Sequence, residues 1–141
     1  MPAFRFQMRL FAVLLCCVCV GCGPRSPFSY VKSRGKITYE DGSVIPAGIR
    51  LNFAAMDAPE VAGAHPRPGL AMVDSQGEFA CVTSYKYGDG LIAGKHKVSI
   101  DQATDSKGKL LVPREYTSIA TTPLVVDTNA VPFEIKVPKP K

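Results

Sequence analysis

The feature that most constrains the fold is a set of short segments in which apolar and polar residues alternate. Residues 49–53 read Ile-Arg-Leu-Asn-Phe, and residues 133–137 read Phe-Glu-Ile-Lys-Val. Such alternation places every second side chain on one buried face, as in a half-buried β-strand. Further strands are predicted at residues 31–39, 70–73, 78–84, 94–101 and 124–127. No window shows the i, i+3, i+4 apolar spacing that is typical of a helix.

Turn-forming residues separate these segments. Asp41-Gly42 and Asp74-Ser75-Gln76-Gly77 each bring a glycine to a position where positive φ is tolerated. Short strands alternating with such turns predict an all-β fold, a β-sandwich of about seven strands. We expect two antiparallel sheets packed face to face. Residues 57–68 and 102–121 are expected to be long loops.

The alternation also predicts which side chains form the core. One face of each strand carries the larger apolar or aromatic residues, and the other face carries polar ones. The residues predicted to point inward are Ile37, Tyr39, Ile49, Leu51, Phe53, Phe79, Cys81, His96, Val98, Ile100, Phe133, Ile135 and Val137.

The first residues of the chain have the pattern of an export signal. Arg5 and Arg9 precede an uncharged apolar run over residues 10–20. That run matches the apolar region of a signal peptide and is shorter than the ~20 residues of a transmembrane helix. Residues 19–22, Cys-Val-Gly-Cys, resemble the lipobox of bacterial lipoproteins, although Cys19 stands where Leu, Val or Ile is usual. An ordinary signal peptide or an uncleaved anchor remains the alternative.

The lipobox resemblance implies cleavage before Cys22 and lipid attachment, including palmitate, at its thiol and amino group. The prediction divides the chain into a signal peptide (1–21), a lipidated tether (22–30), a β-sandwich domain (31–137) and a basic tail (138–141). Loss of the leader removes three cysteines and lowers the formal net charge from +5 to +3. Cys81 would then lack an intrachain disulfide partner. The scattered basic residues do not predict a nucleic-acid partner.

Several motifs together resemble carboxypeptidase regulatory-like domains, which have a transthyretin-like fold. Residues 35–48 carry a strand followed by Asp-Gly and Pro, residues 73–79 carry D-x-x-G-x-F, and residues 90–100 carry a glycine-led alternating strand. The segments 112–116 and 122–124 resemble the closing part of small secreted lipoproteins of planctomycete bacteria. The resemblance implies a seven-stranded Greek-key β-sandwich of the prealbumin-like or Ig-like kind, which is usually non-catalytic. His96 departs from the family, which usually has Tyr or Phe there.

Side chains that bind metals or catalyse reactions are few. A blue-copper site needs two His, one Cys and a weak axial ligand, and His65, His96, Cys81 and Met72 supply these types without the usual close spacing. We therefore interpret Cys81 and His96 as core residues. The chain has no G-x-S-x-G motif, and we predict no catalytic activity, no cofactor and no metal.

The residue types allow two further kinds of site, a calcium site and an isopeptide bond. Asp41, Asp74, Asp89 and Asp105 could bind calcium, but each lies beside Gly or Ser, where aspartate bonds its own backbone. No D-x-D-x-D-G loop is present. The second kind is an isopeptide bond between Lys36 and Asn129, with Glu78 as the acid. Formation of this bond would lower the intact mass of the protein by one ammonia.

The sequence thus predicts a membrane-anchored binding or structural module of the cell envelope. It would be held on the inner or outer membrane by its lipid. Loops 57–68 and 102–121 would contact an envelope protein or a glycan, because recognition residues concentrate on loops of a rigid scaffold. The alternative is a small envelope protein with metal-binding, redox or hydrolytic activity that uses His65, Cys81 or His96.

Overall fold

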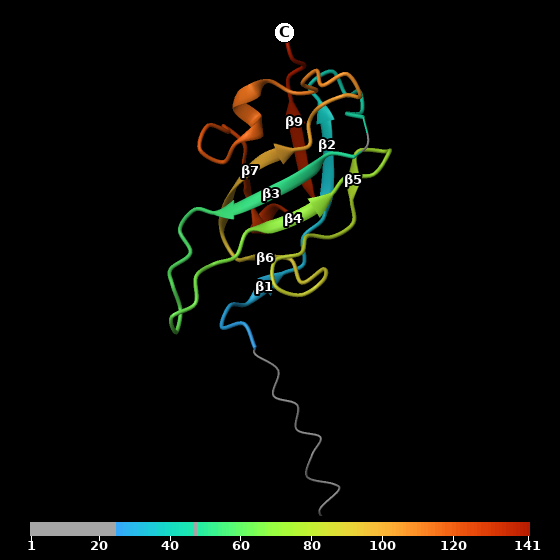
Figure 1. Ribbon diagram of the computed structural model, residues 1–141. Helices are drawn as coiled ribbons and strands as arrows, with labels where there is room; N and C mark the ends of the chain where they lie inside the picture. The colour runs from blue at the N-terminus through green and yellow to red at the C-terminus, as the bar shows by residue number, and fades with distance from the viewer. Residues whose placement is uncertain (1–24, 47) are drawn as a thin grey trace, which may run out of the picture.

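Three aromatic side chains, Phe53, Phe79 and Phe133, meet in the core of the computed structural model. They come from strands of the two larger β-sheets, whose ribbons are drawn in Figure 1. The ring centroid of Phe53 lies 6.0 Å from that of Phe79 and 6.1 Å from that of Phe133. The structure describes residues 25–46 and 48–141. The predicted leader, the lipid attachment at Cys22 and the beginning of the tether lie outside the described residues.

The two larger sheets contain four and three strands. The four-stranded sheet has the order β4 (Gly69–Met72), β3 (Arg50–Ala55), β7 (Lys95–Asp101), β8 (Val125–Asp127), and all its pairs are antiparallel. The three-stranded sheet has the order β5 (Glu78–Phe79), β2 (Gly35–Tyr39), β9 (Phe133–Val137). Together they form the mostly β, sandwich-like fold that the alternation predicts.

One pairing departs from the expected antiparallel sheets. β2 and β9 run parallel, with Gly35 opposite Phe133 and Tyr39 opposite Val137. Parallel neighbours need a long connection between them, and here almost the whole domain lies between the two strands. The prediction of two wholly antiparallel sheets was therefore wrong for this pair.

The described residues form nine strands rather than seven. The two additional strands, β1 (Tyr30–Val31) and β6 (Leu91–Ile92), pair as a small separate ribbon. The predicted strand over residues 78–84 is shorter than expected. β5 ends at Phe79, and the chain then leaves the three-stranded sheet and joins β4 through a single bridge between Leu70 and Thr83.

The predicted core is buried with one exception. Twelve of the inward predictions have less than a tenth of their surface exposed, among them Ile37, Phe53 and His96. Cys81 is the exception, because it is only half-buried. The physical reason is that β5 ends before it, so Cys81 no longer continues the alternation that begins at Phe79. Burial of each large apolar side chain stabilises the folded state by about 1.5–3 kcal/mol.

The two long connections differ in how they contact the domain. Residues 102–121 contribute Ala103 and Val112 to the core, and the hydroxyl of Tyr39 donates to the Leu111 carbonyl at 2.7 Å. This segment includes the 3-10 helix η2 (Arg114–Thr117); a second one, η3 (Thr128–Ala130), precedes β9. Residues 57–68 are mostly exposed and close on themselves through a bridge between Val61 and Ala64.

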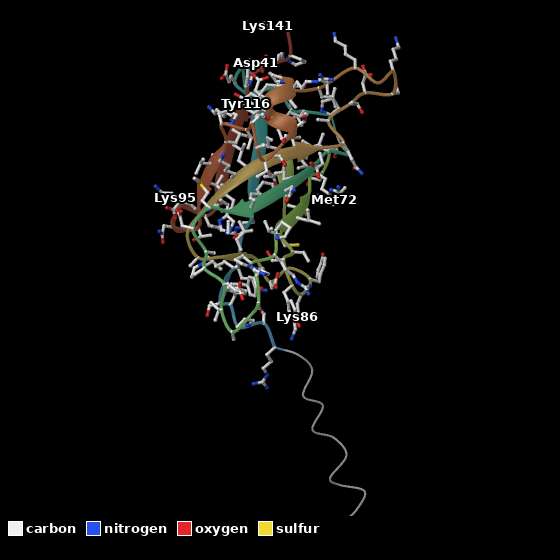
Figure 2. All side chains as sticks on the ribbon, turned by 60° about the vertical axis from the view of Figure 1, so that its left-hand side comes forward. Asp41, Met72, Lys86, Lys95, Tyr116 and Lys141 are labelled. Carbon is white, nitrogen blue, oxygen red and sulfur yellow. The ribbon has the colours of Figure 1, made fainter. Side chains whose placement is uncertain are left out.

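Figure 2 shows the two ends of the molecule. Asp41, Tyr116 and Lys141 lie at one end, and Lys86 lies near the other end, where the described chain begins. Lys139 of the predicted basic tail pairs with Asp41 and lies 5.3 Å from the Tyr39 ring centroid. None of the described helices is long and apolar enough to span a bilayer.

Candidate functional site

The side chains considered for metal binding lie in different environments. The His65 side chain is 81% exposed, and its Nδ1 lies 3.4 Å from Oε2 of Glu60. His96 is buried, and Cys81 is a half-buried free thiol. Among the described residues, no three His, Cys, Asp or Glu side chains are grouped so that they could hold a metal ion.

His96 has the environment of a core side chain, as predicted. Its ring lies on β7, opposite Val126 of β8 and Ala55 of β3, and Nδ1 lies 3.2 Å from the Gly94 carbonyl oxygen. Burial lowers the pKa of His96, and this effect outweighs the Gly94 carbonyl and Asp127, which raise it. The neutral imidazole is therefore the form that the core favours.

The four aspartates considered for calcium accept hydrogen bonds from nearby backbone N–H groups, as the turn interpretation predicts. Asp41 accepts from the Ser43 N–H at 2.9 Å, and Asp74 accepts from the Gln76 N–H at 2.8 Å. Asp89 and Asp105 do the same with residues that follow or precede them by two to five positions. Their lone pairs thus stabilise turns.

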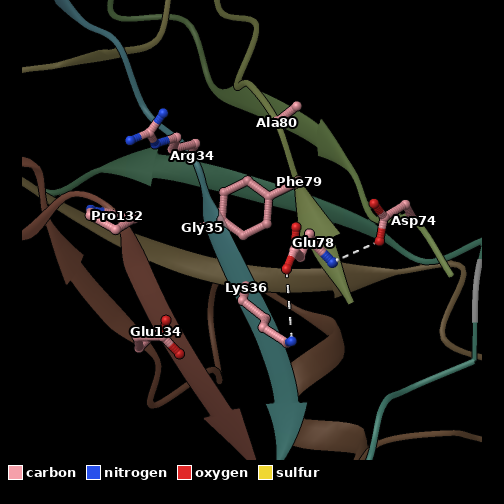
Figure 3. A pocket seen from close by; sticks show the side chains of 9 residues that line it. All are labelled: Arg34, Gly35, Lys36, Asp74, Glu78, Phe79, Ala80, Pro132 and Glu134. Atoms are coloured by element: carbon pink, nitrogen blue, oxygen red, sulfur yellow. Dashed lines mark hydrogen bonds and ion pairs between the residues drawn. The ribbon is translucent and has the colours of Figure 1, made fainter. Parts of the chain in front are cut away.

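A polar hollow lies beside Lys36 and is drawn in Figure 3. It encloses about 280 Å³, and its charged side chains include Arg34, Asp74 and Glu134. Lys36 Nζ lies 3.8 Å from Oε1 of Glu78, and the Glu78 N–H donates to Asp74 at 2.9 Å. Within the hollow, Lys36 is thus paired with Glu78, and Asp74 accepts hydrogen bonds from the backbone of its own turn. We interpret the hollow as a structural feature of the sheet edge.

The proposed isopeptide pair is not brought together by this sheet. Register places Glu134, rather than Asn129, opposite Lys36. Asn129 is exposed in η3, where its N–H donates to the Asp127 side chain at 2.9 Å. The register and the exposure of Asn129 therefore give no support to a Lys36–Asn129 bond.

An apolar groove on the outer side of β4 is the strongest candidate for a binding site. It encloses about 420 Å³, and its lining is Arg50, Leu70, Ala71, Met72, Ala80, Cys81, Thr83 and Tyr87. Leu70 is 41%, Met72 60% and Tyr87 89% exposed. Large apolar side chains left in water in one place are typical of an interaction surface.

The groove exists because β4 has its large side chains on the outer face. Gly69 and Ala71 point inward, while Leu70 and Met72 point outward. A Cβ at Gly69 would lie 2.3 Å from Cδ2 of Leu91 and 2.8 Å from a Val82 methyl group. The core under β4 is therefore filled from β6 and from residue 82, so that small residues are required on the inner face of β4.

The backbone beside the groove is open at one edge of the sheet. Leu70 and Thr83 exchange two backbone hydrogen bonds of 2.9 Å. Within the described chain, this bridge is isolated and does not continue to Met72 and Cys81. Beyond Leu70, β4 and the segment that contains Cys81 therefore separate. The backbone of β4 at Met72 forms a short unpaired strand edge that faces the groove. Unpaired strand edges are places where another polypeptide can add a strand.

Tyr87 lines the groove from the loop of residues 84–90, whose shape depends on Asp89. Its carboxylate accepts from the backbone N–H groups of Ser84 at 2.8 Å, Tyr85 at 2.9 Å and Lys86 at 2.8 Å. Burial raises the pKa of Asp89, but these backbone donors outweigh it and hold the pKa below its usual value. Asp89 therefore shapes the loop that presents Tyr87.

Arg50 forms the polar part of the groove. Its Nη2 lies 3.1 Å from Oδ2 of Asp101, the residue opposite it on β7. Its Nε and the Oδ1 of neighbouring Asn52 are buried without a hydrogen-bond partner. Arg50 lines the groove, whereas Asn52 does not, and an unpaired buried polar atom costs free energy.

This groove was not found by reasoning from the sequence. The prediction placed recognition on loops 57–68 and 102–121, and neither contributes a lining residue. A signal was present: in Gly-Leu-Ala-Met the large and small residues alternate. Alternation of size among apolar residues says that two faces differ, but only the tertiary structure says which face is inside.

Comparison with known proteins adds no relative. No protein-family model, no curated protein and no solved structure gives a significant match to this chain.

Proposed function

We propose that this chain is an exported, lipid-anchored β-sandwich module of the cell envelope that binds a partner polypeptide without catalysing a reaction. The observation that carries the binding role is the apolar groove beside β4, with Leu70, Met72 and Tyr87 exposed. A rigid sandwich supports it, because Ile37, Phe53 and the rest of the core are buried on both sheets.

The proposed anchor is a lipid on Cys22, on either the inner or the outer membrane. Its basis is the lipobox-like sequence Cys-Val-Gly-Cys after an apolar run. Two or more acyl chains hold a protein on a membrane where one chain is marginal. The proposed fold is a prealbumin-like Greek key, similar to carboxypeptidase regulatory-like domains. Sheets of three and four strands support this assignment, with β1 and β6 as an added ribbon.

A polypeptide suits the groove better than a glycan does. The lining is mainly apolar, and the free edge of β4 at Met72 offers backbone groups that an extended chain can pair with. Addition of a strand combines main-chain hydrogen bonds with pockets for alternate side chains. A glycan, in contrast, would need more polar partners than the groove supplies.

Photo-crosslinking in the producing cell tests the binding role. A photoreactive amino acid at position 72 should give one discrete, heavier adduct that contains a second polypeptide. The same amino acid at position 125 is the matched control, because Val125 is 49% exposed on β8, the other edge strand of the same sheet. Equal adducts at both positions, or none at position 72, would contradict the proposed groove.

The anchor is tested separately. Cells grown with labelled palmitate should label the protein, and the Cys22→Ser variant should lose both the label and the cleavage of the leader. Label that survives this substitution would exclude Cys22 as the attachment site. The two tests are independent, since the groove is formed by described residues and does not include Cys22.

A further inference from the structure

The link between the proposed lipid and the folded domain is much shorter than the predicted tether of residues 22–30. Ser26 Oγ and Tyr30 Oη lie 2.8 Å apart, and the Phe28 N–H donates to Ser26 Oγ at 3.3 Å. Residues 25–28 also line a hollow of about 180 Å³ together with Ala64, His65, Arg67 and Tyr85. The first described residues therefore already belong to the domain.

This short link determines which end of the domain faces the membrane. Three residue steps separate Cys22 from Arg25, and a fully extended chain covers at most ~3.6 Å per residue, or ~11 Å in all. With the lipid on Cys22, as proposed above, the backbone of Arg25 can lie no farther than that distance from the lipidated residue. The opposite end, with Asp41 and Lys141, points away from the bilayer (Figure 2).

The membrane-facing end has basic and aromatic side chains side by side. We call it the tether face and define it by Arg25, Lys32, Arg67, Lys86 and the two tyrosines at positions 85 and 87. The Arg67 guanidinium lies 5.0 Å from the Tyr85 ring centroid. Lys32 Nζ donates to the Gly88 carbonyl at 2.7 Å, so it lies against the same loop as Lys86.

Two carboxylates at this end, those of Glu60 and Asp89, are outnumbered by the four cations of the tether face. Glu60 lies 3.4 Å from His65. Asp89 accepts three backbone hydrogen bonds from residues 84–86 and points into its own loop. The cations at the surface of this end, among them Arg67 and Lys86, are exposed. This end of the domain therefore presents positive charge toward the bilayer.

We propose that the tether face binds the headgroups of anionic phospholipids and so holds the domain directly on the membrane surface. Charges interact over a Debye length of ~8 Å at physiological salt, which is comparable to the reach of the link. Basic side chains near an anionic surface are attracted to it. Tyrosine suits the interface because it has an apolar ring and a polar tip, and Tyr87 is almost fully exposed. The orientation rests on the lipid anchor of the proposed function.

Lysine footprinting on the complete protein tests this proposal. The full chain is expressed in a bacterium, purified from its membranes and placed in vesicles of phosphatidylcholine alone or of equal parts phosphatidylcholine and phosphatidylglycerol. Acetylation rates of individual lysines are then read by mass spectrometry. We expect phosphatidylglycerol to slow acetylation of Lys86 about fivefold, the factor that corresponds to the attraction of one lysine to an anionic surface. Lys109, in the exposed segment 104–109, should react equally in both vesicles.

Two controls separate headgroup binding from other causes of protection. Salt at 1 M, which shortens the Debye length to ~3 Å, should restore the reactivity of Lys86. Arg67→Gln should reduce the protection of Lys86, whereas Arg114→Gln, a matched change of an exposed arginine in η2, should leave it unchanged. Protection that is equal in both kinds of vesicle would overturn the proposal.

The same sample distinguishes failure of the anchor from failure of the tether face. The mass of the N-terminal peptide reports whether Cys22 carries lipid. A lipidated Cys22 together with an unprotected Lys86 overturns the headgroup proposal and leaves the anchor standing. An unmodified Cys22 overturns the anchor, and specific protection of Lys86 by phosphatidylglycerol would still support the tether face.

Discussion

Residues 74–78 and residues 105–109 form two turns with the same pattern, Asp-Ser-x-Gly-x. In each, the aspartate Oδ1 accepts from the N–H groups two and four residues later, at 2.8 and 2.9 Å. In each, the glycine has positive φ, 79° for Gly77 and 78° for Gly108. Judged by their internal hydrogen bonds, the two turns are the same structure.

Their surroundings differ completely. The Gly77 carbonyl accepts from the Ile37 N–H of β2 at 2.8 Å, and a Cβ at Gly77 would lie 2.6 Å from the Ile37 carbonyl oxygen. Gly108 has no atom within 4 Å of its Cβ position, and residues 104–109 are exposed. The comparison shows that local hydrogen bonds define the shape of a turn. The contribution of the turn to the free energy of unfolding depends instead on the segments that it contacts.

The largest expected effect separates the two glycines. Gly77→Ala should lower the free energy of unfolding by about 3 kcal/mol, since it combines a strained positive φ with a clash against the β2 backbone. Gly108→Ala should cost about 1 kcal/mol, from the strained φ alone. Chemical denaturation of both variants measures this difference. Equal losses would mean that contact with β2 adds nothing to the turn.

A third aspartate turn extends the comparison to pH. The Asp89→Asn substitution replaces one acceptor oxygen by an amide NH₂ group. In either orientation of the amide, this NH₂ group faces at least one backbone N–H that donates to Asp89 in the wild type. We expect a loss of about 2 kcal/mol at neutral pH, because hydrogen bonds to a charged group are the strong ones. Asp57→Asn, at an exposed position, is the matched control and should change little.

The pH dependence of this loss has a definite sign. Because the folded-state pKa of Asp89 is lowered, its contribution is present above the unfolded value of about 3.9 and disappears as pH falls through the folded value. Wild type and Asp89→Asn should therefore approach each other in stability in acid. Denaturation curves from pH 7 downward measure this, and a constant difference at all pH values would contradict the role of the charge.

The smallest expected effect compares the two Asp-Ser turns directly. Asp74→Ala should cost about 1 kcal/mol, typical of losing a side-chain cap. Asp105→Ala should cost only a few tenths, because the exposed turn can open without disturbing the core. Hydrogen exchange measures the same difference at one amide. The Ile37 amide, which donates to the Gly77 carbonyl, should exchange faster in Asp74→Ala and at the wild-type rate in Asp105→Ala.

Much of the sheet structure could be predicted from the sequence. The strands predicted at residues 31–39, 49–53, 94–101 and 133–137 correspond to β2, β3, β7 and β9. His96 was predicted inward and is buried. These predictions succeed because a strand with one buried face needs an apolar residue at every second position, a requirement visible within five to seven residues.

Other parts depend on contacts that no local pattern contains. Cys81 was predicted inward but is half-buried, because β5 ends at Phe79 and the chain crosses to the other sheet. The parallel pairing of β2 with β9 joins residues about 98 positions apart. The groove at Met72 depends on Leu91 and Val82 filling the core beneath β4. Each depends on partners that are distant in sequence.

The sequence by itself determined local conformations: the strands β2, β3, β7 and β9 with their buried faces, and the Asp-Ser-x-Gly turns. These rest on the pleat of the backbone and on hydrogen bonds that span four residues at most. Only the tertiary structure decided that the turn at Gly77 is packed against β2 while the turn at Gly108 is exposed. It also decided that Leu70 and Met72 line a groove and that Arg67 and Lys86 lie at the end where the described chain begins. Such outcomes follow from which distant segments fill the space around each element, and this depends on the packing of the whole chain.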